Sequence, residues 1–221
     1  MSRAALVASA ATLLAACASG PAPPAWQADA KAAADRATGA YLAGETNASD
    51  AEMGRARRSL TSTGRADLLA RAELMHCAAR VASLVFEPCA RFEVLRADAP
   101  AAERVYADHL AGRALARDDI ARLPAAQQAA AVAVVGGEAS PTAVQGIEDP
   151  LARLIAAAVL FQAGKASPSM IDAAAETASS QGWRRPLLAW LKVQALRAER
   201  AGDATEARRL QRRIELVEAA K

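Results

Sequence analysis

The chain has 221 residues, 63 of them Ala, and carries 27 Lys and Arg against 24 Asp and Glu, which gives a formal net charge of +3. This length predicts one domain or two small ones. Only 4% of the residues are aromatic, and aromatic and β-branched side chains are what fill large sheets, so the composition disfavours a large β fold. A low net charge together with abundant Ala, Leu, Arg and Glu argues against a disordered chain and favours ordered helices.

The first 17 residues are organised like an export signal. A short, positively charged start at residues 1–3 precedes residues 4–16, which are small or apolar and carry no charge. This run is too short to span a bilayer, which needs about 20 residues. It ends in Leu14-Ala15-Ala16-Cys17, and this segment resembles the lipobox of bacterial lipoproteins.

The lipobox resemblance implies that residues 14–17 form the signal-cleavage site and that Cys17 is the lipidation site. Cys17 would become the acylated first residue of the mature chain, and two or more acyl chains hold a protein stably on a membrane. Ala18 rather than Asp follows Cys17, which by resemblance to the Gram-negative sorting rule implies the outer membrane, facing the periplasm. The alternatives are an ordinary secretory peptide with a chance Cys, or a buried N-terminal helix.

The Pro-rich stretch at residues 19–24 predicts a short extended tether, because proline lacks an amide donor and favours an extended backbone. We therefore divide the chain into a cleaved signal peptide at residues 1–16, the lipidated Cys and tether at 17–25, and an all-helical domain at 26–221. The most apolar later run, residues 151–161, contains Arg153 and is too short for a membrane span. It predicts a core helix.

Gly, Pro and capping residues divide the domain into nine or ten expected helices. In the first half, we expect helices over 26–42, from Ser49 or Asp50 past Leu60, from about Thr63 to Ala82, from Pro100 to Gly112, and a short one capped by Asp118-Asp119. In the second half, we expect helices over 124–135, 150–162, 168–180, from Arg185-Pro186 to 200, and from Asp203 to 220. Only residues 132–135 have the character of a strand, and one strand cannot make a sheet.

A weak internal repeat supports a stack of helical hairpins. Pro150-Leu151 recurs as Pro186-Leu187, and Ala163-Gly164 recurs as Ala201-Gly202. The intervals of about 36 to 38 residues are typical of helical-hairpin arrays. The fold class is therefore predicted as all-α, built from antiparallel helical hairpins.

The second unit, residues 190–216, resembles a tetratricopeptide repeat. The resemblance rests on small residues at the helix contacts and a tight turn between the helices, namely Ala195, Ala198, Ala201-Gly202-Asp203, Ala207 and Ile214. The unit departs from that pattern at Gln211, where an aromatic is expected, and at Leu191, where Trp is expected. A tetratricopeptide-like α-solenoid and a compact helical bundle both remain open.

Cys77 and Cys89 remain as an even pair once Cys17 is assigned to the lipid. In an oxidising compartment such a pair predicts a disulfide. Along one continuous helix the two residues would lie about 18 Å apart, so the bond requires the chain to fold back between them, which Pro88 permits. The alternative is two small buried hydrophobic residues.

No metal, cofactor or catalytic site is predicted. His76, Cys77, Cys89 and His109 do not have the closely paired spacing of zinc ligands, and His76 is expected on a polar helix face with Glu73 and Arg80. The sequence has no Gly-x-Ser-x-Gly, no His-Glu-x-x-His and no Gly-rich phosphate loop. An envelope enzyme that acts on peptidoglycan through scattered carboxylates is the alternative function.

The leading prediction is a lipid-anchored binding or scaffold module for another envelope protein. The basic pairs near the C-terminus alternate with acidic residues, which indicates a solvated face of mixed charge and no nucleic-acid partner. Aromatic residues and Arg are enriched in protein interfaces. The candidate partner-binding residues are therefore Trp183, Arg184, Arg185 and Trp190, with burial in the core as the alternative for Trp190.

Overall fold

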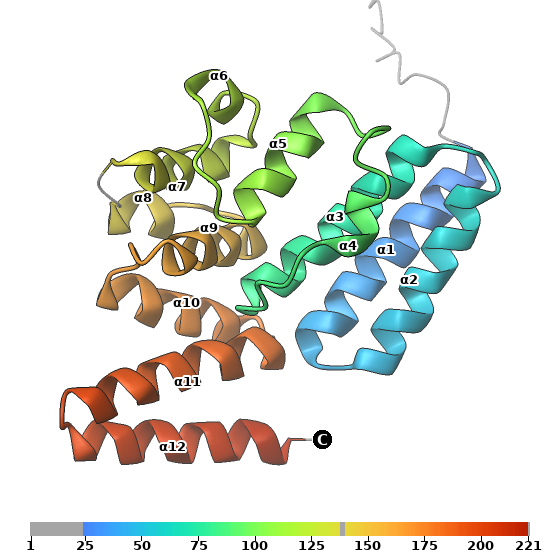
Figure 1. Ribbon diagram of the computed structural model, residues 1–221. Coiled ribbons are helices and arrows are strands. Elements are labelled where there is room, and N and C mark those ends of the chain that lie inside the picture. The colour runs from blue at the N-terminus through green and yellow to red at the C-terminus, as the bar shows by residue number, and fades with distance from the viewer. Residues whose placement is uncertain (1–23, 138–139, 221) are drawn as a thin grey trace, which may run out of the picture.

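The computed structural model describes residues 24–137 and 140–220 (Figure 1). The signal peptide and Cys17, with the cleavage residues Leu14, Ala15 and Ala16, lie outside the described residues. Within those ranges the secondary structure is helical throughout, as predicted. The helices are α1 (Ala25–Ala43), α2 (Thr46–Thr61), α3 (Ala66–Ala82), α4 (Ala90–Glu93), α5 (Ala101–Leu110), α6 (Arg117–Ile120), α7 (Ala125–Val135), α8 (Pro141–Gln145), α9 (Pro150–Gln162), α10 (Pro168–Ser180), α11 (Arg184–Arg200) and α12 (Ala204–Ala219).

The start signals in the second half of the sequence are confirmed. The side chains of Asp149, Ser167 and Asp203 each accept a hydrogen bond from a backbone N–H in the first turn of the helix that follows, at 2.6, 3.2 and 2.9 Å. Proline occupies the first helical position of α9 and α10, where its missing N–H breaks no intrahelical bond. Capping side chains and proline thus fix the starts of α9, α10 and α12.

Two expected helix starts in the first half are wrong. Helix α2 begins at Thr46, directly after Gly44 ends α1 in a left-handed conformation (φ 89°). Ser49 therefore lies inside α2 and is buried, and its Oγ donates to the Ala37 carbonyl at 2.8 Å, so that it joins α2 to α1 and caps nothing. Helix α3 begins at Ala66 and not near residue 63, because Gly64 takes a positive φ of 67°.

Residues 132–135 belong to α7, in agreement with the helix expected over 124–135. The short elements differ from the prediction. The two aspartates at 118 and 119 lie inside the first turn of α6, behind Ala116 at the cap position. Sequence patterns missed α4 and α8, which have four and five residues, because one turn is too short to show a helical period.

The helices form a stack that is closed at one side by the N-terminal hairpin (Figure 1). Helices α9 to α12 pack in succession, each against the next, and α11–α12 is an antiparallel hairpin at the end of the stack. Helix α3 packs on α9, while α1 packs on α2, α3 and α11. A pure solenoid has contacts only between successive repeats. The contact between α1 and α11 therefore makes this fold an array that closes on itself.

Small side chains make up much of the core. In α9, Ala156, Ala157 and Ala158 are at most 1% exposed, so neighbouring helices approach closely on several sides. The largest fully buried side chain, Trp190 of α11, packs edge-on against Phe161 and donates from Nε1 to the Ala82 carbonyl at 3.2 Å. This hydrogen bond satisfies a buried polar atom and connects α11 to the end of α3.

Cys77 and Cys89 form a disulfide with their Cα atoms 5.7 Å apart. The chain folds back after α3 through Leu84, which has a positive φ of 59°, and Val85 donates its backbone N–H to the Arg80 carbonyl at 3.0 Å. The fold-back that the sequence required for this bond is therefore made by the turn at residues 83–85, before Pro88 is reached.

We expect the Cys77→Ser, Cys89→Ser double variant to lose about 3 kcal/mol of unfolding free energy, because an open turn gains conformational freedom in the unfolded chain. Urea denaturation followed by far-UV circular dichroism measures this loss. Reducing agent should lower the stability of the original chain by a similar amount and leave that of the double variant unchanged. Equal stabilities of the oxidised and reduced chains would contradict the prediction.

Because His109 is buried, we expect the protein to lose stability on acidification. The side chain is 1% exposed and its Nε2 lies 3.2 Å from Gln127 Oε1, while burial lowers its pKa below the usual 6.5. Below pH 6.5 the unfolded chain therefore binds a proton that the folded chain does not, so the unfolding free energy falls between pH 7 and pH 5. His109→Gln should flatten this pH slope in urea titrations; an unchanged slope would contradict it.

Candidate functional site

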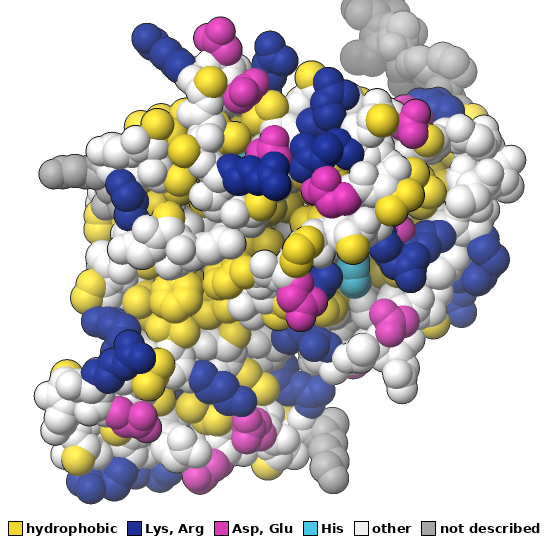
Figure 2. All heavy atoms as spheres, viewed as in Figure 1, with side chains coloured by type: hydrophobic (Ala, Val, Ile, Leu, Met, Phe, Trp, Pro, Cys, Tyr) yellow, Lys and Arg dark blue, Asp and Glu magenta, His cyan; other side chains and the backbone are white. Residues whose placement is uncertain are grey.

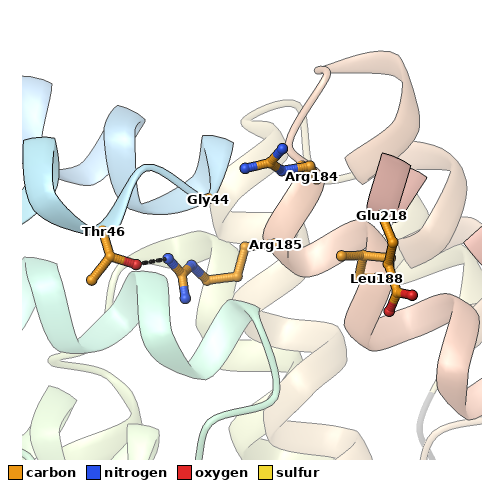
Figure 3. Close-up of a pocket in the computed structure, with 6 residues that line it drawn as sticks. All are labelled: Gly44, Thr46, Arg184, Arg185, Leu188 and Glu218. Atoms are coloured by element: carbon orange, nitrogen blue, oxygen red, sulfur yellow. Dashed lines mark hydrogen bonds between the residues drawn. The ribbon is translucent and has the colours of Figure 1, made fainter. Parts of the chain in front are cut away.

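The described surface has a hollow of about 610 Å³ between the N-terminal and C-terminal hairpins. It lies where the turn between α1 and α2 faces the first turn of α11 and the end of α12 (Figure 3). We call it the arginine pocket, and its lining residues are Gly44, Thr46, Arg184, Arg185, Leu188 and Glu218. Two of the four residues predicted to bind a partner, Arg184 and Arg185, therefore lie side by side in one pocket.

Three contacts with the N-terminal hairpin fix Arg185. Its Nε donates to the Tyr41 carbonyl at 2.7 Å, and its Nη2 donates to Thr46 Oγ1 at 2.7 Å (Figure 3). The guanidinium also lies over the Tyr41 ring at 4.2 Å from the centroid, a favourable cation–π distance. The side chain of Arg185 is thus pre-positioned, with N–H groups on Nη1 and Nη2 still available.

Arg184 reaches the same turn from the other side of the pocket. Its Nη1 donates to the Ala220 carbonyl, and a Cβ atom placed on Gly44 would lie 2.9 Å from both Nε and Nη2. Glycine at position 44 therefore meets two requirements: it permits the positive φ of the turn, and it lets the Nε–Nη2 edge of Arg184 pack closely against the backbone of the turn.

The opposite wall carries Leu188 and Glu218 (Figure 3). The Glu218 carboxylate pairs with Lys192 at 2.9 Å. Among the described residues, no carboxylate lies within ion-pair distance of Arg184 or Arg185. The arginine pocket therefore presents two positive charges beside a neutralised wall.

The two predicted tryptophans do not form a binding surface with the arginines. Trp190 has no exposed surface, so its place in a partner-binding face is corrected: it belongs to the core. Trp183 is half-buried against the small cluster around Tyr41 and Leu42. Its place before Arg184 means that packing of the indole helps to hold the start of α11 against α1.

Sequence reasoning missed Tyr41, Gly44 and Thr46 as parts of this site. Gly44 lies just beyond the helix expected over 26–42, and nothing in the sequence connects it with a residue 140 positions later. Arg185 and Tyr41 are 144 positions apart. Only the packing of α1 on α11 brings these residues together.

His76 packs against Tyr41 and does not belong to an exposed charge cluster as expected. Its ring meets the Tyr41 ring edge-on at 5.4 Å, and burial lowers its pKa. Glu73, expected on the same polar face, is 6% exposed and binds Arg57 of α2 through both carboxylate oxygens, at 2.5 and 2.9 Å. These two side chains therefore help to pack α3 against α1 and α2.

Several carboxyl groups have a lowered pKa, each because of a neighbouring arginine. Arg65 lowers the pKa of Asp67 to about 2, and Arg96 and Arg209 lower those of Glu93 and Glu206. A general acid in peptidoglycan cleavage needs the opposite, a raised pKa. These three carboxylates are thus ion-pair partners of arginine.

The part of the chain that the structure describes contains no cluster of three metal-ligating side chains, and His76, Cys77, Cys89 and His109 do not gather into one. No helix within residues 24–137 and 140–220 is long and apolar enough to cross a membrane. Over α11 and α12 at the bottom of Figure 2, acidic and basic side chains alternate, as the sequence indicated for this face.

The comparisons with known proteins return nothing: no protein-family model, no curated protein and no solved structure matches this chain.

We expect Arg185→Lys to lower the unfolding free energy by about 1 to 2 kcal/mol, because lysine keeps the charge but cannot reproduce the planar contacts with Tyr41 and Thr46. Arg184→Lys is the matched control, with an expected loss under about 0.5 kcal/mol, because among the described residues Arg184 makes a single hydrogen bond, to the Ala220 carbonyl. Urea denaturation measures both. Equal losses of unfolding free energy would contradict the prediction that Arg185 stabilises the contact between α11 and the N-terminal hairpin.

Proposed function

We propose that this protein is a lipid-anchored cell-envelope protein that acts as a helical binding or scaffold module for another envelope protein, without catalysis. Cys17 is the anchor, on the outer membrane and facing the periplasm. The observation that carries the binding function is the arginine pocket, a hollow of about 610 Å³ lined by two adjacent arginines that have no carboxylate partner among the described residues. Charged side chains without an internal partner are available to a ligand.

The position of the pocket supports this proposal. The tether would join the domain at Ala25, the start of α1, whereas the pocket lies beyond the other end of the same helix, at Gly44. Nineteen residues at about 1.5 Å each separate the two ends by about 28 Å. A module anchored through Cys17 could thus hold its membrane end and present the pocket to a partner at the opposite end of α1.

We expect that in-cell crosslinking of the original chain, followed by purification from membranes and mass spectrometry, captures a defined envelope protein, and that Cys17→Ser loses it. Without the acyl chains the protein no longer shares a surface with the partner, so encounter becomes rare. Membrane fractionation shows whether the variant has lost the anchor, and intact-mass measurement of the original chain shows whether it is lipidated.

An original chain that stays monomeric and partner-free in the membrane fraction would contradict the scaffold function. An unmodified Cys17 thiol on the exported protein would contradict the anchor.

A further inference from the structure

A second hollow, of about 380 Å³, lies between α1, the end of α2 and α3, and it shares no lining residue with the arginine pocket. We call it the apolar groove, and its apolar lining residues include Ala28, Ala34, Leu60, Leu68, Ala72 and Met75. We propose that the apolar groove binds an acyl chain carried by Cys17 of the same molecule while the protein is outside a bilayer. This inference rests on the proposed lipid anchor and gives the anchor a binding site on the domain.

The apolar groove follows about two turns of α1 and two turns of α3. Its lining recurs every three or four residues within residues 27–35 of α1 and within residues 68–75 of α3, so each set lies on one face of its helix. At 1.5 Å per residue the α1 side is about 12 Å long. Small side chains at Ala28, Ala34 and Ala72 leave space that longer ones would fill. The result is a narrow, elongated site.

The chemistry of the lining favours hydrocarbon. Met75 is 40% exposed although it is apolar. The three charged residues of the lining are all ion-paired: Lys31 pairs with Asp35 at 2.6 Å, and Arg71 pairs with Glu103 at 2.5 Å. The aliphatic stems of long charged side chains also cover apolar surface. A ligand without hydrogen-bonding groups therefore loses nothing by binding here, whereas a polar ligand would give up its contacts with water.

A single chain suits this groove better than a helix of a partner protein. A helix is 10 to 12 Å wide with its side chains, so on a groove two turns long it could insert only a few side chains. Such a contact is far smaller than the roughly 1,200 Å² that a specific protein interface buries. An acyl chain is narrow and apolar along its whole length, as the groove is.

The position of the groove identifies the source of this chain. The described residues begin at Pro24, and the groove begins at Gln27, in the first turn of α1. The seven residues from Cys17 to Pro24 reach at most about 25 Å, which is about twice the length of the groove. A group on so short a linker has an effective concentration in the millimolar range. The acyl chain of the same molecule therefore competes well against free lipid or a second copy.

This site would act while the protein passes between membranes. An acyl chain in water is unfavourable in proportion to its exposed apolar area, and the groove covers part of that area. A bilayer covers the whole chain, and each further buried methylene favours the bilayer about fourfold. The groove therefore releases the chain when a membrane is within reach, and no energy source is needed.

The test uses the full chain as cells make it. Cells are grown with a palmitate analogue that carries a photoactivatable diazirine, and intact-mass measurement shows whether Cys17 carries it. The purified protein is diluted below the critical micelle concentration of its detergent and irradiated, and mass spectrometry identifies the peptides crosslinked to the acyl chain. We expect most crosslinks within residues 25–35 and 66–75. Crosslinks spread evenly over the surface would overturn the site.

A pair of variants tests the lining. Met75→Glu places a carboxylate in the groove and should lower the yield of groove crosslinks at least tenfold, because hydrocarbon cannot solvate a charge. Leu196→Glu is the matched control: Leu196 of α11 is 45% exposed and lies outside the groove, so the yield should change less than twofold. Thermal unfolding of both variants confirms that they fold. Equal yields in the two variants would overturn the groove as the binding site.

Two further arms test the occupant. Chains labelled with light and heavy nitrogen are mixed before irradiation, and crosslinks that join a light chain to a heavy one would show that a second copy supplies the acyl chain, which overturns the intramolecular site. In phosphatidylethanolamine vesicles we expect the groove crosslinks to fall at least tenfold, because the bilayer takes the chain. Undiminished crosslinks in vesicles would overturn the release to a membrane.

The outcomes distinguish this inference from the proposed function. A Cys17 thiol that carries no analogue would contradict the lipid anchor, and the inference falls with it. An acylated Cys17 without crosslinks in the groove would refute the inference alone and leave the anchor and the scaffold function standing.

Discussion

Close approach between helices is the constraint on which this structure depends. Alanine is the most abundant residue, and a methyl side chain contributes little buried area by itself. It compensates by letting backbones come near each other, so that α9 is surrounded by α3, α7 and α10 with its three central alanines fully buried. A few large side chains then fix the geometry, Trp190 above all, because its indole reaches from α11 to the last carbonyl of α3.

The array closes on itself at the junction between α1 and α11. Helices α9 to α12 stack as successive hairpins, which by itself would give an open solenoid. Instead, Arg185 spans the junction and binds both the end of α1 and the start of α2. A guanidinium suits this position because it donates in several directions in one plane and also stacks on an aromatic ring. The interaction that closes the fold also forms one side of the arginine pocket.

The arginine pocket is built from contacts between two hairpins that are far apart in the sequence. Tyr41 and Thr46 use part of the hydrogen-bonding capacity of Arg185, and Gly44 lets the side chain of Arg184 approach the turn closely. Because the pocket lies between two hairpins, each hairpin supplies groups that the other lacks: a turn with a glycine and a hydroxyl from one, two cations from the other. A ligand bound here would contact both halves of the chain.

The sequence by itself determined the helical class and the starts of α9, α10 and α12. It also predicted a disulfide between Cys77 and Cys89 that needs a folded-back chain, but left two buried free cysteines as the alternative, which the structure decided against. The helical class and the helix starts depend on local chemistry, namely capping oxygens, proline at the first turn and the low β propensity of the composition, which act over a few residues.

The sequence did not predict short helices such as α4, because one turn shows no helical period. It also misplaced the start of α2, because Ser49 has the side chain of a capping residue but lies at a core contact. Arg184 and Arg185 could be named as candidates, since arginine is common in interfaces, but Trp190 was indistinguishable from a surface aromatic until its burial was known. The arginine pocket itself was decided only by tertiary structure, because its parts lie up to 144 positions apart and nothing but the packing of α1 against α11 brings them within reach of one ligand.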